Sequence, residues 1–292
     1  MTLVSAYSGW AAYGASVRDA RTGRVTDLVK PPADASFGRV TSTGGGVFIL
    51  TVSRPAHSVL AYRLGVDASG RAAEFNPLPG DLLPAECREI AASLSGTVLA
   101  YAAWDMTPPG RTAEAGLVDL ATGVRRVASV PPGVVRDLSL ANDGQTLAFQ
   151  LETRSDAASG IYVASAAAAD WVAHDRLLND PDGQPYHAIR PVISADGRAV
   201  YATVAQPGPW DDPHWTRLLE IPAAGGPPRV LFELRYQPDR HNAVYMWGSV
   251  CRDPAGESLL AFASSCVYRI EISSGAVIRL PFSEGQPYDA AW

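Results

Sequence analysis

Charged residues stand at one equivalent position in several related stretches of the chain. Seven residues before a recurring glycine lie Arg39, Glu89, Asp137, Arg190 and Ser249. If these stretches surround one axis, Glu89 and Asp137 become neighbouring carboxylates. Like charges a few ångströms apart raise the pKa of one carboxyl group or recruit a cation. The arginines can instead pair with the carboxylates, because charges in a poorly solvated space are costly unless they are paired.

A second set of candidate functional side chains lies in Gln-Pro loops and in the proline-rich segment 206–215. Its members are the aromatic and histidine residues Tyr186, His187, Trp210, His214, His241, Tyr245 and Trp247. Histidine serves as a general base or a zinc ligand, and aromatic residues are common anchors in recognition. We predict a ligand-binding face here and no metal site. A catalytic face, a zinc site and loops that only pack on their neighbours are the alternatives.

The recurring glycines define a repeat that positions both sets. Their spacings are 50, 48, 53 and 59 residues, and the glycines are Gly46, Gly96, Gly144, Gly197 and Gly256. Each glycine ends a polar turn and precedes an apolar strand. A period near fifty with strands on both sides of a turn is typical of a four-stranded propeller blade. We expect a two-residue hairpin loop at each turn, with glycine supplying the positive φ.

A second hairpin in each unit, such as Asp119–Gly123, raises the count to four strands per period. At the start of the chain, three short apolar stretches within residues 1–30 lack an inner strand, and Tyr288–Trp292 reads as an inner strand without partners. We therefore predict an all-β, six-bladed β-propeller with four antiparallel strands per blade. It forms a single domain over residues 1–292, closed by a blade from about 1–30 plus 285–292. Asp289 then joins the charged position, whereas a frayed C-terminal tail is the alternative.

The inner hairpins carry a resemblance to a known group. Ser194-Ala195-Asp196-Gly197, with Ala148-Phe149 and Ala100-Tyr101 in other copies, resembles the Ser-Pro-Asp-Gly and Leu-Ala-Tyr pattern of TolB-like and WD40-like β-propellers. The resemblance runs over nearly the whole chain. The overall sequence pattern is similar to that of uncharacterised six-bladed propellers of actinobacteria. The sequence shows no α/β domain like the one that precedes the propeller in TolB, and no Trp-Asp endings of WD40 repeats. What is known of TolB's partner therefore carries over only weakly.

Composition excludes several classes of function. The formal charge is −6 and Lys30 is the one lysine among 24 basic residues, which argues against a nucleic-acid partner. No apolar run reaches the roughly 18 residues of a membrane span. The three cysteines, Cys87, Cys251 and Cys266, have no metal-ligand spacing and read as small buried residues. The compartment stays open: cytoplasmic if Met1 begins the natural chain, extracytoplasmic if the sequence is part of a longer one.

Two functions follow from these patterns. The first is a non-catalytic module that recognises a protein, peptide or small molecule with one loop face and the mouth of a central channel. Its expected ligand-binding residues are Arg39, Glu89, Asp137, Arg190, Tyr186, His187, Trp210, His214, His241, Tyr245, Trp247 and Asp289. The alternative is a small-molecule lyase, cyclase or hydrolase, with His187, His241, Glu89 and Asp137 as catalytic candidates. No cofactor is predicted, although a cation between Glu89 and Asp137 remains open.

Overall fold

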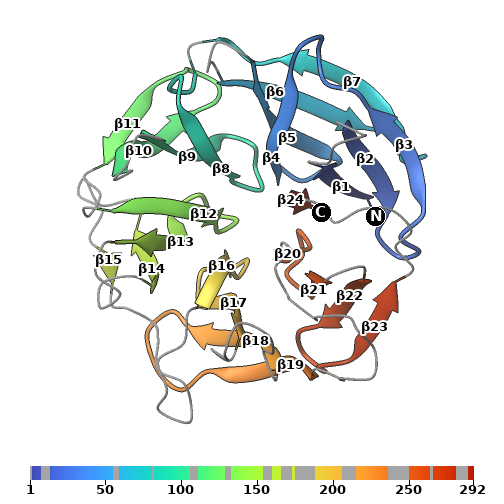
Figure 1. The fold of residues 1–292 in the computed structure, drawn as a ribbon, viewed down its shortest axis with the longest axis vertical. Coiled ribbons are helices and arrows are strands. Elements are labelled where there is room, and N and C mark those ends of the chain that lie inside the picture. Colours follow the sequence, from blue (N-terminus) through green and yellow to red (C-terminus); the bar gives the residue numbers. More distant parts are fainter. Residues whose placement is uncertain are drawn as a thin grey trace.

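The structure is a computed structural model of the 292-residue chain. It describes residues 2–7, 14–54, 59–80, 82–105, 111–128, 133–153, 160–165, 173–174, 188–205, 215–235, 250–263, 266–280 and 289–292, with the backbone alone at some strand ends, including Asp289. Every regular element in these ranges is a β-strand. The strands are arranged as a ring of sheets around a central axis (Figure 1).

Five blades each contain four consecutive antiparallel strands. The first comprises β4 (Ser36–Ser42), β5 (Val47–Ser53), β6 (Val59–Val66) and β7 (Ala72–Pro77). The second comprises β8 (Cys87–Ala92), β9 (Val98–Asp105), β10 (Arg111–Asp119) and β11 (Arg125–Ala128). The third comprises β12 (Val134–Leu140), β13 (Thr146–Glu152), β14 (Gly160–Ser165) and β15 (Ala173–His174). The fourth comprises β16 (Ala188–Ile193), β17 (Ala199–Ala205), β18 (Trp215–Pro222) and β19 (Arg229–Arg235). The fifth comprises β20 (Val250–Arg252), β21 (Ser258–Ala263), β22 (Cys266–Glu271) and β23 (Val277–Leu280).

The remaining four-stranded sheet is made from both ends of the described chain. Its order is β24 (Asp289–Ala291), β1 (Thr2–Tyr7), β2 (Gly14–Asp19) and β3 (Val25–Val29). β24 runs antiparallel to β1, with Val4 opposite Ala291 and Ala6 opposite Asp289. Counted as units of four consecutive strands, the described chain thus has five blades rather than six, and the sixth sheet is a composite. The composite forms because β24 covers the edge that β1 would otherwise leave unpaired.

The turns between inner and second strands differ from the prediction. At Gly96, the Ser93 N–H donates to Val98 O at 2.9 Å, so four residues rather than two separate the paired strands. The Gly96 N–H donates to Ser93 O, which closes a β-turn, and Gly96 then adopts a φ of 66°. The expected two-residue loop is therefore wrong. The glycine is still required, because it occupies the left-handed position through which the chain re-enters the sheet.

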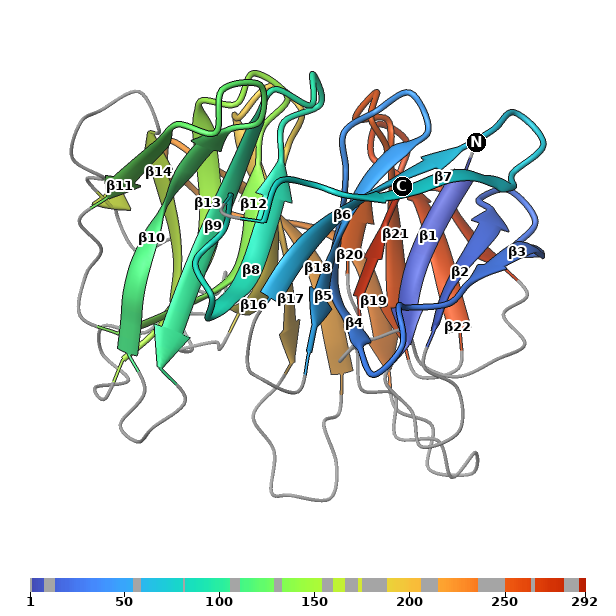
Figure 2. The same ribbon diagram turned by 90° about the horizontal axis from the view of Figure 1, so that it is seen from above.

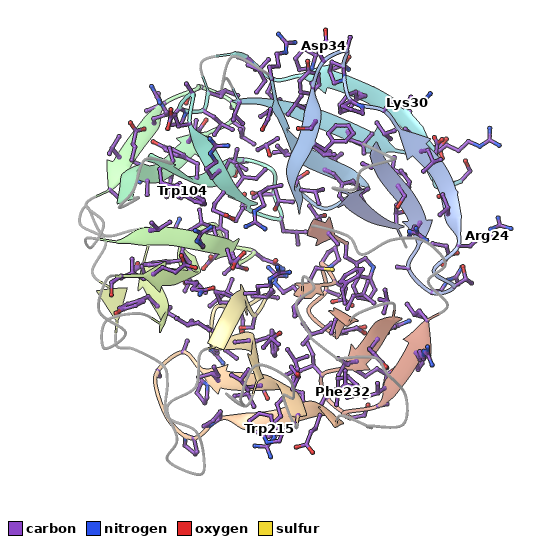
Figure 3. All side chains as sticks on the ribbon, viewed as in Figure 1. Arg24, Lys30, Asp34, Trp104, Trp215 and Phe232 are labelled. Carbon is purple, nitrogen blue, oxygen red and sulfur yellow. The ribbon has the colours of Figure 1, made fainter. Side chains whose placement is uncertain are left out.

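The hydrophobic core lies between the faces of neighbouring sheets. One cluster joins Ala100 and Leu117 of the second blade to Leu147 and Phe149 of the third. The middle strands are buried on both faces, and the run from Leu99 to Ala103 is at most 2% exposed. Such strands read as continuous apolar runs rather than as an alternation. Charged side chains such as Arg24, Lys30 and Asp34 lie at the outer rim of the ring (Figure 3).

Candidate functional site

A cavity of about 140 Å³ lies on the axis of the ring. All six innermost strands, β4, β8, β12, β16, β20 and β24, contribute residues to its wall. Four residues from the predicted charged position, Arg39, Glu89, Asp137 and Arg190, line it. Asp289 lies in β24 beside them, but its side chain is outside the described part of the structure. The repeat therefore brings side chains 48 to 151 residues apart into one small space.

β-Bulges determine where these charged side chains lie. The register of four inner strands shifts there, first between Phe37 and Val40 in β4 and between Arg136 and Ser139 in β12. The same irregularity occurs between Cys87 and Glu89 in β8 and between Ile189 and Val192 in β16. An extra residue in one strand bends it and re-aims its side chain, which is a known use of bulges near binding sites.

Gly38 shows why the bulge in β4 needs its local sequence. A Cβ atom at this position would lie 2.5 Å from the Thr51 Oγ1 atom. The same hydroxyl oxygen accepts a hydrogen bond of 2.7 Å from the Arg39 N–H. Because glycine leaves room for Thr51, the bulge is held by this bond, and the Arg39 side chain enters the cavity.

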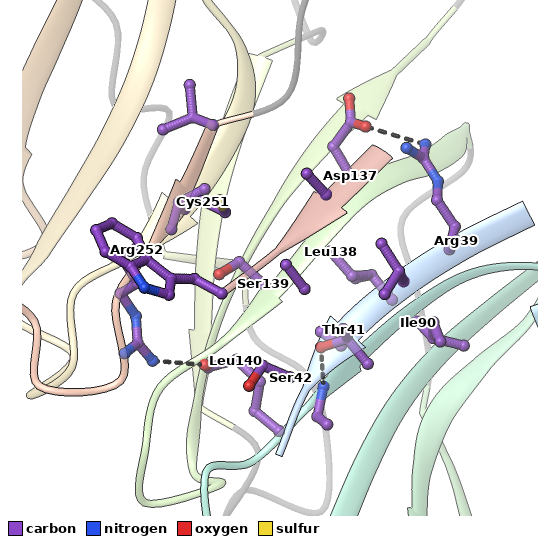
Figure 4. Close-up of a pocket in the computed structure, with 18 of the residues that line it drawn as sticks. Arg39, Thr41, Ser42, Ile90, Asp137, Leu138, Ser139, Leu140, Cys251 and Arg252 are labelled. Carbon is purple, nitrogen blue, oxygen red and sulfur yellow. Dashed lines mark hydrogen bonds and ion pairs between the residues drawn. The ribbon is translucent and has the colours of Figure 1, made fainter. Parts of the chain in front are cut away.

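Arg39 pairs with both carboxylates of the charged ring. Its Nη2 atom donates to Glu89 Oε1 at 2.5 Å and to Asp137 Oδ1 at 3.0 Å. The three side chains are largely buried, with exposed fractions of 14%, 4% and 17% respectively. The Arg39–Asp137 pair is visible in Figure 4. One guanidinium thus compensates two neighbouring carboxylates from two other blades, which is one of the arrangements that the sequence left open.

This pairing bears on the expected cation between Glu89 and Asp137. The guanidinium already supplies positive charge to both carboxylates. Within the described residues, no group of three or more His, Cys, Asp or Glu side chains could hold a metal ion. A bound cation at Glu89 and Asp137 stays an untested prediction.

Arg190 stands in a different environment from Arg39. It lines the same cavity, and no described carboxylate lies within 4.0 Å of its guanidinium. Its φ is 57°, and Asp137 has a φ of 49° at the matching bulge in β12. Non-glycine residues rarely adopt this left-handed conformation. Arg190 is therefore a strained, positively charged residue facing the cavity without an ion-pair partner in the described structure.

A hydrogen-bonded cluster around Arg252 closes one end of the cavity wall. Its Nε donates to Ile193 O at 2.7 Å, and its Nη2 donates to Asn142 Oδ1 at 2.6 Å and to Leu140 O at 3.3 Å. Figure 4 shows the Arg252–Leu140 contact. The Asn142 Nδ2 in turn donates to Pro254 O at 3.1 Å. Burial, which disfavours the charged form, lowers the pKa of Arg252.

Two hydroxyl groups join neighbouring inner strands beside this cluster. Thr41 Oγ1 accepts from the Ala92 N–H, and Ser139 Oγ accepts from the Ile193 N–H, each at 3.0 Å. Both hydroxyls stand five residues before a recurring glycine. These two bonds satisfy backbone N–H groups that strand pairing within a blade would leave unpaired, and they connect neighbouring blades.

Arg252 and Trp292 are wall residues that the sequence prediction missed as site residues. Trp292 is 3% exposed, lines the cavity and packs with Ala290 and Cys251. The guanidinium of Arg269 lies 5.8 Å from the centre of its ring. The alignment on the recurring glycines could have found both residues. It puts Arg252 and Trp292 at the position that Ser42 and Ala92 occupy in other blades.

The predicted loop residues lie outside the described part of the structure. These are Tyr186, His187, Trp210, His214, His241, Tyr245 and Trp247. The described strands that flank these segments are β15 and β16, β17 and β18, and β19 and β20. In an antiparallel blade, the end of the second strand, the end of the outer strand and the start of the inner strand meet at one face of the ring (Figure 2). The shared loop face therefore stays a prediction that the topology permits.

The two cysteines whose side chains are described have no reactive environment. Cys87 and Cys251 are buried and are not joined in a disulfide, which confirms their interpretation as small buried residues. Burial raises the pKa of Cys87 to about 12, and its thiol donates to Glu89 O at 3.4 Å. A thiol so rarely ionised is a poor nucleophile. No membrane-spanning helix is found in the part of the chain that the structure describes.

Comparisons with known proteins identify the fold. The sequence matches no protein-family model and no curated protein. TolB from Acinetobacter baumannii superimposes with a TM-score of 0.66 and 13% identity, over 100% of this chain and 65% of that one. This chain thus spans less than two thirds of that TolB.

Two further solved structures are similar. A TolB from Agrobacterium tumefaciens has a TM-score of 0.58 and 16% identity, over 88% of this chain and 83% of that one. Hydrazine synthase from Kuenenia stuttgartiensis has a TM-score of 0.58 and 14% identity, over 97% of this chain and 84% of that one. At such identities the similarity concerns the fold alone, and the chain has the fold of a TolB-like β-propeller.

Proposed function

We propose that this protein is a non-catalytic recognition module that holds its ligand at the axial cavity and on the loop face around it. The observation that carries the proposal is the cavity wall, to which every inner strand contributes. Ligand sites in proteins are concave and contain a few fixed polar groups among apolar ones. Arg39, Glu89, Asp137 and Arg190 are such groups here, among residues such as Val192 and Leu138.

The wall is held rigid by contacts between blades. Arg39 joins β4 to β8 and β12, and Arg252 joins β20 to β16 and β12. A preorganised wall reduces the ordering cost of binding, because little of it must be fixed when the ligand arrives. This rigidity favours recognition of a protein, peptide or small molecule.

A channel-filling variant tests the proposal. Ser42 lines the cavity and is half-buried, so Ser42→Trp should fill the space, whereas Thr122→Trp adds the same side chain to an exposed outer turn. Immobilised wild type and both variants are incubated with a cell lysate and with its small-molecule extract. We expect a species retained by wild type and Thr122→Trp and lost from Ser42→Trp. Equal retention by all three proteins contradicts binding at the cavity, and turnover of an extract component by wild type contradicts a non-catalytic role.

The enzyme alternative relies on His187 and His241, which lie outside the described residues, together with Glu89 and Asp137. In the structure, one oxygen of each carboxylate already accepts from Arg39, so both groups take part in joining the blades at the axis. The described part of the molecule therefore favours recognition. If turnover is found, its loss in His187→Ala and His241→Ala would support the alternative.

A further inference from the structure

The charges that line the axial cavity do not balance among the described residues. Three arginines and two carboxylates line it: Arg39, Arg190, Arg252, Glu89 and Asp137. Arg39 pairs with both carboxylates. Arg252 donates to carbonyl and amide oxygens and has no described carboxylate within ion-pair distance. The described charges that line the cavity therefore sum to +1, and an uncompensated charge is costly in a poorly solvated site; the side chain of Asp289 in β24 lies outside the described part of the structure.

Arg190 is the cation placed to meet a ligand. Arg252 is held by four acceptors, whereas no hydrogen bond or ion pair of the Arg190 guanidinium is found in the described structure. Arg190 has a left-handed φ of 57°, is followed by Pro191, and lies at the bulge of β16 in the cavity wall. Such conformations are strained and cluster at ligand sites. Asp137, the other strained residue of the ring, already has its ion pair with Arg39.

A second donor in the cavity wall also lacks an acceptor. The indole Nε1 of Trp292 is buried and has no hydrogen-bond partner in the described structure, and the residue is 3% exposed. Buried donors without partners are rare, so this N–H marks an incompletely satisfied part of the wall, although the nitrogen itself has almost no accessible surface. Trp292 is the last residue of the chain and Arg190 lies in β16, and both line the same cavity.

We infer that the axial cavity binds a carboxylate group, with Arg190 as its ion-pair partner. This inference rests on the proposed recognition function and names the chemical class of its ligand. A planar guanidinium matches the two oxygens of a carboxylate. The volume of about 140 Å³ is close to that of cavities that hold benzene, so the enclosed group is a small acid or an acidic side chain of a partner.

Calorimetric titration with benzoate and benzamide tests the inference. The two probes have the same shape and differ in charge, and ionic strength is kept constant. Wild type should bind benzoate at least tenfold more tightly than benzamide, as expected for a hydrogen bond between charged groups. Arg190→Gln should lose about tenfold or more in benzoate affinity, and Arg190→Lys should lose less. Arg198→Gln is the matched control, because Arg198 is exposed and does not line the cavity.

The outcomes separate this inference from the proposed function. Equal affinity for benzoate and benzamide, or full benzoate affinity in Arg190→Gln, overturns the inference. If Ser42→Trp still abolishes retention of a lysate component in that case, the recognition function stands and the ligand is not a carboxylate. A parallel titration with an acetylated, amidated peptide containing one Glu distinguishes the sources. Binding of benzoate alone indicates a small acid, and binding of the peptide indicates an acidic partner; either supports the inference.

Discussion

The Nη2 atom of Arg39 in β4 lies 2.5 Å from Glu89 Oε1 in β8 and 3.0 Å from Asp137 Oδ1 in β12. The two carboxylates are 50 and 98 residues away from the arginine in sequence. The shared nitrogen therefore joins three blades at the axis. It also determines which charges in the cavity are already satisfied and which are available to a ligand.

Removal of this guanidinium should destabilise the protein strongly. Arg39→Met leaves two buried carboxylates next to each other without a cation, and breaking a buried ion pair by removing one partner costs about 3 kcal/mol or more. Urea unfolding measures the loss. The triple variant Arg39→Met, Glu89→Gln, Asp137→Asn should recover most of it, because no charge is left unpaired.

The control for this prediction is Arg63→Met, at an exposed position in β6. Its effect should stay within about 0.5 kcal/mol, as is usual for exposed substitutions. A triple variant that is less stable than Arg39→Met would show that the three residues do not act as one charge-compensated group.

Arg252 should not be replaceable by lysine. Its planar guanidinium reaches acceptors on Ile193, Leu140 and Asn142, and a single ammonium cannot reproduce that geometry. We expect Arg252→Lys to lower the free energy of unfolding by about 2 kcal/mol, because buried acceptors lose their donor. The exposed Arg279→Lys in β23 provides the comparison and should change little. Equal stability of both variants would refute a structural role for the cluster.

The β24–β1 pairing predicts that the ends of the sequence can be separated and recombined. Deletion of residues 289–292 removes the strand beside β1 and the buried Trp292, so the melting temperature should fall. A synthetic peptide of residues 285–292 should restore it by adding the missing strand. A scrambled peptide should not. If the shortened chain melts like the full one, the closure does not contribute to stability.

We expect Asp119, in an outer turn, to make a pH-dependent contribution to the stability of the folded protein. Its Oδ1 accepts from the Thr122 N–H at 2.8 Å, which is the largest of the contacts that lower its pKa below the ordinary 3.8. A carboxylate with a lowered folded pKa stabilises the protein fully above pH 3.8 and loses this effect as the pH falls through the folded value. Asp119→Ala should therefore melt earlier than wild type at pH 7, and the difference should vanish in acid. A difference that does not change with pH would contradict this.

The repeat made the positions of the inner strands predictable, but the lengths of the turns that follow them could not be predicted. Gly96 and its equivalents locate the turns because a left-handed residue is needed there, and this need is visible in sequence. The number of residues in each turn depends on the hydrogen bonds that close it, such as that between Ser93 and Val98. These bonds follow from strand pairing, so the two-residue expectation failed.

The candidate site was predictable as a set of positions, not as a set of contacts. Alignment on the glycines brings Arg39, Glu89, Asp137 and Arg190 to one level. Which arginine takes the carboxylates depends on bulges, and the same alignment gives no reason for Arg39 to hold both. Arg252 was missed because its acceptors are mostly backbone carbonyls, which every sequence contains.

A crystal structure with 4-bromobenzoate is the most direct measurement of the ligand chemistry, because bromine marks its own position by anomalous scattering. The account predicts a bromine peak in the axial cavity, with the carboxylate within hydrogen-bond distance of the Arg190 guanidinium. A peak only outside the cavity, or an empty cavity at a concentration that saturates the protein in solution, would contradict it.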